Sequence, residues 1–333
     1  MSKLKSSQTL IYWFIEIQHC ETVLRRFETI EHGGQFMGRL SLVLIFLVLT
    51  LSFSVNGEEN NVHQIRGGGS VVMEMSTAVW CDVCAEHEEW IPDMVDSNGD
   101  RIIRVNLHSA INDPLGNEAS NYRKNWLGIS DADSTPSYTF DGLRESTPSS
   151  SSGELQRSLL DAEADRIQHE ILEVSISYNS SIVSVEAVVD DPLEVNSTTM
   201  TLMLLENEAS ISPEDATNGK LSSNYVLKNI ISVNENELIV YPQEWGHATF
   251  NSNYSIFSNF TFSWPNGLDY SSTTIVVIHE KSVTSPEIGA RTTLSALSWT
   301  LDQSIENESI SLWIPLILTG AIIAIVRLYS TEQ

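Results

Sequence analysis

Trp80-Cys81-Asp82-Val83-Cys84 is the stretch of sequence that decides the fold. It follows an apolar, strand-like run at 70–75 and precedes a helix-like segment at 85–95. The start of a helix leaves backbone N–H groups free and adds positive potential, so a thiolate on Cys81 is favoured over the thiol. Cys84, one turn into the helix, can then attack a mixed disulfide formed by Cys81. We therefore predict a redox pair with Cys81 as the nucleophile and Cys84 as the resolving thiol.

The segments around this motif alternate between strands and helices. After the motif the sequence predicts a strand, a helix, a short strand and a second helix, at 101–107, 118–126, 138–140 and 154–169. Such alternation is typical of an α/β layer structure, and we place this domain at residues 66–170. We expect the polar, glycine-containing residues before it, 58–69, to form a spacer.

From residue 171 the chain consists of short β-branched and aromatic runs separated by Asn, Asp, Gly and Pro. Several of these runs alternate with polar residues, as half-buried strands do. This pattern favours an all-β, immunoglobulin-like sandwich at residues 171–286. We find no catalytic constellation in it, because His247 and His279 are isolated in the sequence.

A second motif supports a family resemblance. Ser134-Thr135-Pro136-Ser137-Tyr138-Thr139-Phe140-Asp141-Gly142, taken with the cysteine pair, resembles the segment of thioredoxin-like domains in which a cis-proline precedes a strand and a turn. The resemblance implies that Thr135 lies against the disulfide and offers its backbone to a bound substrate chain. Thr135 and Pro136, with a partly exposed Trp80, are therefore the expected substrate-binding residues.

A closer likeness is to bacterial surface lipoproteins, and similar archaeal exported proteins, that join a thioredoxin-like domain to a β-sandwich. It is carried by Val105-Asn106-Leu107-His108, by Asn112-Asp113-Pro114-Leu115-Gly116-Asn117 and by Trp126-Leu127-Gly128-Ile129. The likeness covers residues 66–170 well and 171–300 mainly by pattern.

Two acidic residues depart from the thioredoxin pattern. Thioredoxins keep a buried acid six residues before the first cysteine, where this chain has Met75 with Glu74 beside it. Neighbouring strand residues point to opposite faces, so Glu74 should not serve as the proton acceptor for Cys84. Asp82, between the cysteines, should oppose the thiolate on Cys81 by like-charge repulsion. We therefore expect Cys81 to be a weaker acid than in strongly oxidising members, and the couple to lean toward the reducing side.

Both ends of the chain carry apolar segments. Residues 37–57 resemble a secretory signal peptide starting at Met37, which would make 1–36, with Cys20, an extension foreign to the protein. The alternative is a long cytoplasmic extension before an uncleaved anchor. Residues 310–329 predict a C-terminal transmembrane helix with Arg327 at the interface, after a stalk at 287–309, and the alternative is a buried element. The sequence thus predicts a single-pass protein of the cell membrane with its bulk on the extracytoplasmic side.

Charge limits the possible ligands. The chain has 18 Lys and Arg against 44 Asp and Glu, a formal net charge of −26. Nucleic acids and anionic membranes require basic residues to replace counterions, so we predict no nucleic-acid partner. No cofactor or metal is predicted, although His87 and His108 could extend the cysteine pair to a zinc site.

The sequence leaves two classes of function open. The first is a membrane-anchored thiol–disulfide oxidoreductase that acts on exported proteins with thiols or disulfides and is restored by an unknown membrane redox partner. The second is a surface binding or adhesion protein in which the thioredoxin-like domain is a scaffold. In that case the Cys81–Cys84 pair is a structural disulfide that holds the helix start.

Overall fold

The computed structural model describes residues 61–130, 135–146, 151–166, 169–178, 181–282 and 290–301. The described residues belong to one compact unit. The predicted extension at 1–36, signal peptide at 37–57 and transmembrane helix at 310–329 lie outside them. Within the described ranges, no helix is long and apolar enough to span a membrane.

Residues 71–165 form an α/β part. Its parallel strands β2 and β3 adjoin the antiparallel strands β4 and β5, and four helices pack on them. In chain order the elements are β2 (Val71–Thr77), α3 (Asp82–His87), α4 (Ile91–Asn98), β3 (Ile102–His108), α5 (Glu118–Trp126), β4 (Ser137–Phe140), β5 (Leu143–Ser146) and α6 (Ser152–Asp165), with one 3₁₀ turn at Gly99–Arg101.

The helix predicted at 85–95 is divided into α3 and α4. α4 begins at Ile91, with Pro92 in its first turn, and Trp90 is its N-cap. Proline is well tolerated in the first turn of a helix but not in its interior, because it lacks an N–H group and crowds the preceding turn. The chain therefore ends α3 at His87 and starts a new helix.

The all-β part contributes a five-stranded antiparallel sheet. Its strands lie in the order β1 (Asn61–Gly67), β6 (Leu172–Tyr178), β7 (Ile182–Val189), β12 (Ile256–Ser263) and β11 (Gly246–Ser252). The spacer expected at 58–69 is wrong from residue 61 onward, because β1 pairs with β6 along its full length. Alternate β1 side chains such as Ile65 pack against the core between the sheets. The free energy gained by burying them stabilises the strand even though most residues of the segment are polar.

The second sheet of the all-β part continues into the α/β part. Its strands run β14-β13-β8-β9-β3-β2-β4-β5, with β10 also paired to β9. The strands not yet placed are β8 (Thr198–Ser210), β9 (Ser222–Val233), β10 (Leu238–Tyr241), β13 (Thr273–Lys281) and β14 (Thr293–Thr300). The stalk expected at 287–309 therefore contains β14, which pairs with β13 and buries Ala296.

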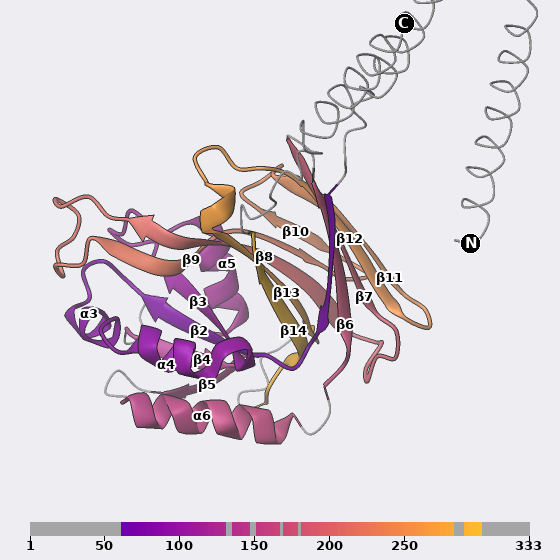
Figure 1. Cartoon of the computed structure of the whole chain (residues 1–333), viewed down its shortest axis with the longest axis horizontal. Helices are drawn as coiled ribbons and strands as arrows, with labels where there is room; N and C mark the ends of the chain where they lie inside the picture. The colour runs from indigo at the N-terminus through magenta and orange to yellow at the C-terminus, as the bar shows by residue number, and fades with distance from the viewer. Residues whose placement is uncertain are drawn as a thin grey trace, which may run out of the picture. The chain divides into compact units, whose positions relative to one another are not determined.

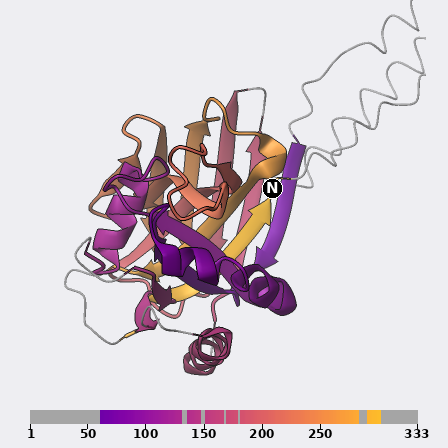
Figure 2. The ribbon, with the colours of Figure 1, turned by 90° about the vertical axis from the view of Figure 1, so that its left-hand side faces the viewer.

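Three large apolar cores follow from this arrangement. One lies between the two sheets of the all-β part. A second contains Met73 and Met75 of β2 with Leu155 and Leu159 of α6. A third contains Val72 of β2 with Ala119 of α5. α4 and α6 thus cover one face of β2–β4 and α5 covers the other (Figures 1 and 2). β2 is therefore buried at all seven positions, although Glu74, Ser76 and Thr77 are polar.

A buried salt-bridge network of Arg123, Glu74 and Glu280 links the two parts. Arg123 of α5 donates through Nε to Glu74 at 2.6 Å and through Nη1 to Glu280 of β13 at 2.8 Å. Burial disfavours the charged guanidinium, yet the two carboxylates raise the pKa of Arg123 above its usual value. Burial raises the pKa of Glu74 even though Arg123 opposes that rise. Thr201 of β8 also donates to Glu280, at 2.8 Å.

We expect Arg123→Met to lower the free energy of unfolding by about 3–5 kcal/mol, because it leaves two buried carboxyl groups without their cation. Urea denaturation measures the change. Arg101→Met is the matched control: Arg101 pairs with Glu163 at the surface, where an ion pair contributes roughly 0–1 kcal/mol. Equal losses for the two variants would show that the buried group does not hold the parts together.

Asp141 is another buried acid, in the turn after β4. Its Oδ1 accepts from the Val72 backbone N–H at 3.0 Å and forms an ion pair with Arg166. Its carbonyl accepts from the Thr292 N–H at 2.8 Å, which ties the turn to the segment before β14. Burial raises the pKa of Asp141 to about 6, although Arg166 and Arg291 oppose the rise.

This shift predicts a pH dependence of stability. Because the pKa of Asp141 is higher in the folded state, about 6, than its ordinary value of 3.8, its contribution is full below pH 3.8 and is lost as the pH rises through 6. The free energy of unfolding of the wild type minus that of Asp141→Asn should therefore fall by about 2 kcal/mol between pH 4 and pH 7. Asp191→Asn, at an exposed position, is the control and should give a flat difference.

Candidate functional site

The disulfide Cys81–Cys84 lies where β2 gives way to α3. Cys81 is the N-cap residue of α3, with φ −93° and ψ 106°, and its Sγ accepts a hydrogen bond from the Cys84 N–H at 3.1 Å. The two sulfurs are 2.05 Å apart. Cys81 is 6 % exposed and Cys84 is 1 % exposed. The first cysteine is therefore the one nearer to solvent, and a backbone N–H group already points at its sulfur.

The Thr135–Pro136 segment lies against this disulfide. The Thr135 carbonyl oxygen is 3.6 Å from Cys81 Sγ, and the Thr135–Pro136 peptide bond is cis. In the disulfide form Cys81 has no hydrogen to donate, so this is a contact and not a hydrogen bond. The local geometry that the family resemblance implies is therefore present, and the structure brings together the residues predicted from two separate motifs.

An exposed apolar rim surrounds the first cysteine. Trp80 is 45 % exposed, and its indole Nε1 donates to the Ile111 carbonyl at 2.9 Å. Val83 of α3 and Ile111 also expose much of their side chains. This hydrogen bond holds the Trp80 ring in place while leaving one side of it in solvent. Apolar groups held at a surface in this way can contact an incoming chain.

Glu74 and Met75 point to opposite sides of β2. Met75 belongs to the same core cluster as Cys81 and Cys84, whereas Glu74 binds Arg123 on the α5 side. The prediction that Glu74 does not serve Cys84 is consistent with this placement.

His87 is a buried titratable group on the disulfide side of the sheet. It lies three residues after Cys84 on α3, and its Nδ1 is 2.6 Å from the Tyr138 hydroxyl. Burial lowers the pKa of His87, so the neutral ring is favoured.

The zinc site considered as an alternative finds no support in the described residues. His87 bonds Tyr138, whereas His108 bonds Asp113 at 2.8 Å and Ser223 at 2.9 Å. Within the described ranges, no group of three or more His, Cys, Asp and Glu side chains is placed to hold a metal ion.

The all-β part contributes residues to this site that no sequence motif predicts. The turn between β8 and β9 hydrogen-bonds the backbone just before the first cysteine, through Thr217 and Asn218. Ser223 of β9 bonds His108, and Asn106 bridges Ser223 and Glu88, which follows α3. No local pattern marks these residues, because each lies more than 100 positions from its partner in the α/β part or the redox motif.

His279 is not isolated in the fold. Its Nδ1 bonds Glu170, whose Oε1 also accepts from the Leu193 N–H at 2.6 Å. The His279 and Glu170 side chains are fully buried, so no substrate reaches them. The pair fixes β13 to the segment that enters β6.

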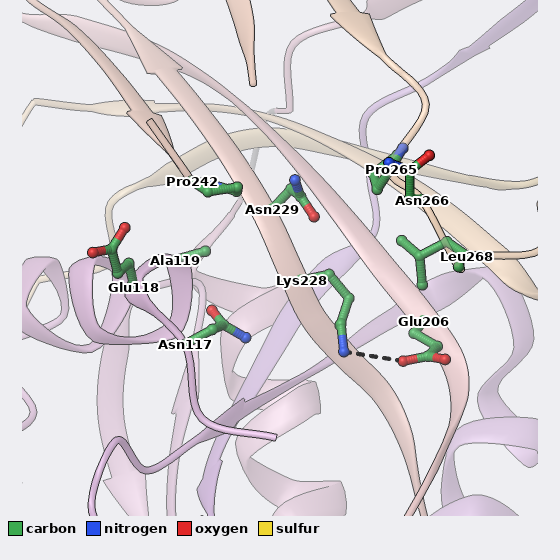
Figure 3. A pocket seen from close by; sticks show the side chains of 11 residues that line it. Asn117, Glu118, Ala119, Glu206, Lys228, Asn229, Pro242, Pro265, Asn266 and Leu268 are labelled. Carbon is green, nitrogen blue, oxygen red and sulfur yellow. Dashed lines mark ion pairs between the residues drawn. The ribbon is translucent and has the colours of Figure 1, made fainter. Parts of the chain in front are cut away.

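A separate pocket of about 520 Å³ lies where α5, β9 and the segment after β12 meet. Figure 3 shows Lys228 directed toward Glu206 on the neighbouring strand, with the two charged groups 3.2 Å apart. The pocket is lined by Asn117, Glu118, Ala119, Glu206, Lys228, Asn229, Pro242, Pro265, Asn266, Gly267 and Leu268. None of the residues of the redox motif lines it, so it is not part of the disulfide site.

Comparison with known proteins gives a likeness at the level of fold. HBP35 of Porphyromonas gingivalis matches with a TM-score of 0.54 and 15% sequence identity, over 71% of this chain and 76% of that protein. The likeness shows a shared fold, which in this chain is an α/β part whose sheet continues into a β-sandwich. No family model matches the chain, and neither does any curated protein sequence.

Two further solved structures are less similar. Protein AGR_C_4864 from Agrobacterium tumefaciens matches with a TM-score of 0.47 and 12% identity, over 71% of this chain and 96% of that protein. A family 9 carbohydrate-binding module from Caldicellulosiruptor kristjanssonii matches with a TM-score of 0.24 and 9% identity, over 38% of this chain and 64% of that module. At these scores neither match bears on function.

The position of Asp82 gives a prediction. Asp82 is exposed in the first turn of α3, next to Cys81. In the reduced protein, Asp82→Asn should raise the alkylation rate of Cys81 at pH 7 by about two- to fivefold at low salt, because it removes a negative charge beside the thiolate. Salt should reduce the effect, since exposed charges are screened. Asp96→Asn, exposed on α4, is the control, and the idea fails if both variants behave like the wild type.

Proposed function

We propose that this protein is a membrane-anchored, extracytoplasmic thiol–disulfide oxidoreductase that acts on exported proteins. The observation that carries the proposal is the asymmetry of the cysteine pair: Cys81 is the more exposed cysteine, and its Sγ accepts the Cys84 N–H and contacts the Thr135 carbonyl. A structural disulfide requires none of these features.

The proposed exchange begins with the reduced protein. The Cys81 thiolate attacks one sulfur of a substrate disulfide, a mixed disulfide forms, and the other substrate sulfur leaves as a thiolate. Cys84, after losing its proton, attacks Cys81 Sγ and releases the second substrate thiol. The substrate gains two electrons, and the protein ends as the Cys81–Cys84 disulfide that the structure contains. A membrane-bound dithiol donor then reduces the pair again.

The apolar rim suits a polypeptide substrate. Trp80, Val83 and Ile111 offer exposed apolar surface beside Cys81, and the Thr135 backbone is adjacent to the sulfur. An extended chain that places its cysteine over Cys81 would bury this surface and form backbone hydrogen bonds with Thr135. Trp80, Thr135 and Pro136 are accordingly the proposed substrate-binding residues.

The location and the partners are proposed from the sequence. The signal peptide at 37–57 and the anchor at 310–329 would put the described residues outside the cell membrane, held by one C-terminal helix. The partners would then be exported proteins with thiols or disulfides and a membrane redox protein. The net charge of −26 argues against nucleic acid as a partner.

Cys84→Ser should trap Cys81 in mixed disulfides with exported proteins, because the resolving thiol is missing. Non-reducing electrophoresis of membranes from the native host, followed by mass spectrometry of the adducts, measures this. The double variant Cys81→Ser/Cys84→Ser is the control and should form no adducts. If the single variant also forms none, the exchange proposal loses its main support.

The reduction potential of the pair separates this function from the scaffold alternative. A value between about −120 and −270 mV, reached rapidly in glutathione buffers, is expected for an exchange catalyst. A value below about −300 mV would indicate a structural disulfide and favour a surface binding or adhesion protein.

A further inference from the structure

The turn between β8 and β9 reaches from the all-β part to the redox motif. Figure 1 shows this turn on the same side of the molecule as α3. We call residues 211–221 the hairpin tip. They contact the backbone at 78–81, which joins β2 to α3 and ends at the first cysteine.

The hairpin tip supplies hydrogen-bond donors to that backbone. The Asn218 amide donates to the Cys81 carbonyl at 3.3 Å and to the Ala78 carbonyl at 3.5 Å. The Asn218 backbone N–H donates to the Val79 carbonyl at 3.1 Å, and the Thr217 hydroxyl donates to the same carbonyl at 3.3 Å. The Ala78 and Cys81 carbonyls also accept backbone N–H groups of the motif, so there the tip adds a second donor, whereas both of these hydrogen bonds to the Val79 carbonyl come from the tip.

The orientation of the Asn218 amide is fixed from within the tip. Its Oδ1 accepts from the Lys220 N–H at 3.1 Å, so its NH₂ group faces the redox loop. Lys220 also pairs with Glu89, just after α3, at 3.4 Å. The tip is therefore attached on both sides of the cysteine motif.

An apolar contact holds the tip in place. Val79 packs in one small core with Ile211 of the hairpin tip, with Ala209 of β8 and Val226 of β9, and with Leu115. Because this core contains residues from both parts of the chain, the position of the tip relative to Val79 is set by packing as well as by hydrogen bonds.

The carbonyls that bind Asn218 also define the geometry of Cys81. The Ala78 carbonyl accepts from the Cys81 N–H at 3.1 Å, and the Cys81 carbonyl accepts from the Ala85 N–H at 3.1 Å. One amide therefore bridges the turn before Cys81 and the first helical bond after it. This arrangement keeps Cys81 extended, so that its Sγ meets the Cys84 N–H.

We propose that Asn218 is a positioning residue of the redox centre, through which the β-sandwich sets the reactivity of Cys81. The amide acts through the backbone and does not touch a substrate. Its removal would let the 78–81 loop depart from the geometry in which the Cys84 N–H stabilises the Cys81 thiolate. The consequence for exchange rests on the proposed function, but the effect on the thiol does not.

The test is the pH dependence of Cys81 alkylation by iodoacetamide in the reduced full chain. Asn218→Ala should lower the rate at pH 7 by about three- to tenfold and move the midpoint of the profile to higher pH, the change expected when a hydrogen-bonded arrangement around a thiolate is loosened. Asn218→Asp keeps the shape but replaces the NH₂ donor with an acceptor, and should give a larger shift in the same direction.

The control is Asn236→Ala. Asn236 is exposed in the turn at the other end of β9, so a general effect of altering a hairpin turn would appear there too. Circular dichroism and the thermal midpoint establish that each variant is folded. Thr217→Val removes one donor to Val79 and serves as a milder variant should Asn218→Ala or Asn218→Asp not fold; its profile should shift in the same direction by a smaller amount.

The inference is overturned if the folded Asn218 and Thr217 variants give the wild-type profile, or if Asn236→Ala shifts it equally. This outcome is independent of adduct trapping by Cys84→Ser. A shifted profile without adducts would refute the exchange function and uphold the positioning role, whereas adducts with an unshifted profile would do the reverse.

Discussion

Arg123 brings a positive charge into a core where its side chain is almost completely shielded from solvent, and the two carboxylates that bind it come from different parts of the chain. Glu74 lies on the central strand of the α/β part, and Glu280 lies on β13 of the all-β part. A buried charge is stable only when its partners are present and well placed. The two parts therefore pack together in the arrangement that brings Glu74 and Glu280 to Arg123.

Buried polar contacts also hold together the sheet that the two parts share. β3 and β9 pair in parallel only at Asn106 and Val226, which is a limited contact for joining two sets of strands. The buried polar side chains around it add to that contact: Asn106 and His108 reach Ser223, and Arg104 pairs with Glu88. Buried polar groups of this kind specify a geometry because any other arrangement leaves them without partners.

The β-sandwich contacts the cysteine motif directly, so its role is not only that of a spacer. As a separate module it would only space or present the redox domain. In the structure its hairpin tip binds the loop that carries Cys81, and its strand β9 extends the sheet that carries the motif. The reactivity of the cysteine pair is then a property of the whole described unit, and a thioredoxin-like domain cut at residue 170 would lack the Asn218 amide.

The sequence by itself determined the features that depend on short-range spacing. The Cys-x-x-Cys pair between strand and helix, the α/β order and the opposite directions of Glu74 and Met75 all follow from residues within a few positions of one another. The place of Thr135 beside Cys81, 54 positions away, was expected only from the family resemblance. Only the tertiary structure decided the rest. The sequence did not predict β1 and β14 as strands because their composition is polar. Their burial depends on partner strands elsewhere in the chain. The pairs Arg123–Glu280 and Asn218–Cys81 are separated by 157 and 137 positions in the sequence. A periodic pattern of residues predicts local structure and does not indicate a contact between positions so far apart in the chain.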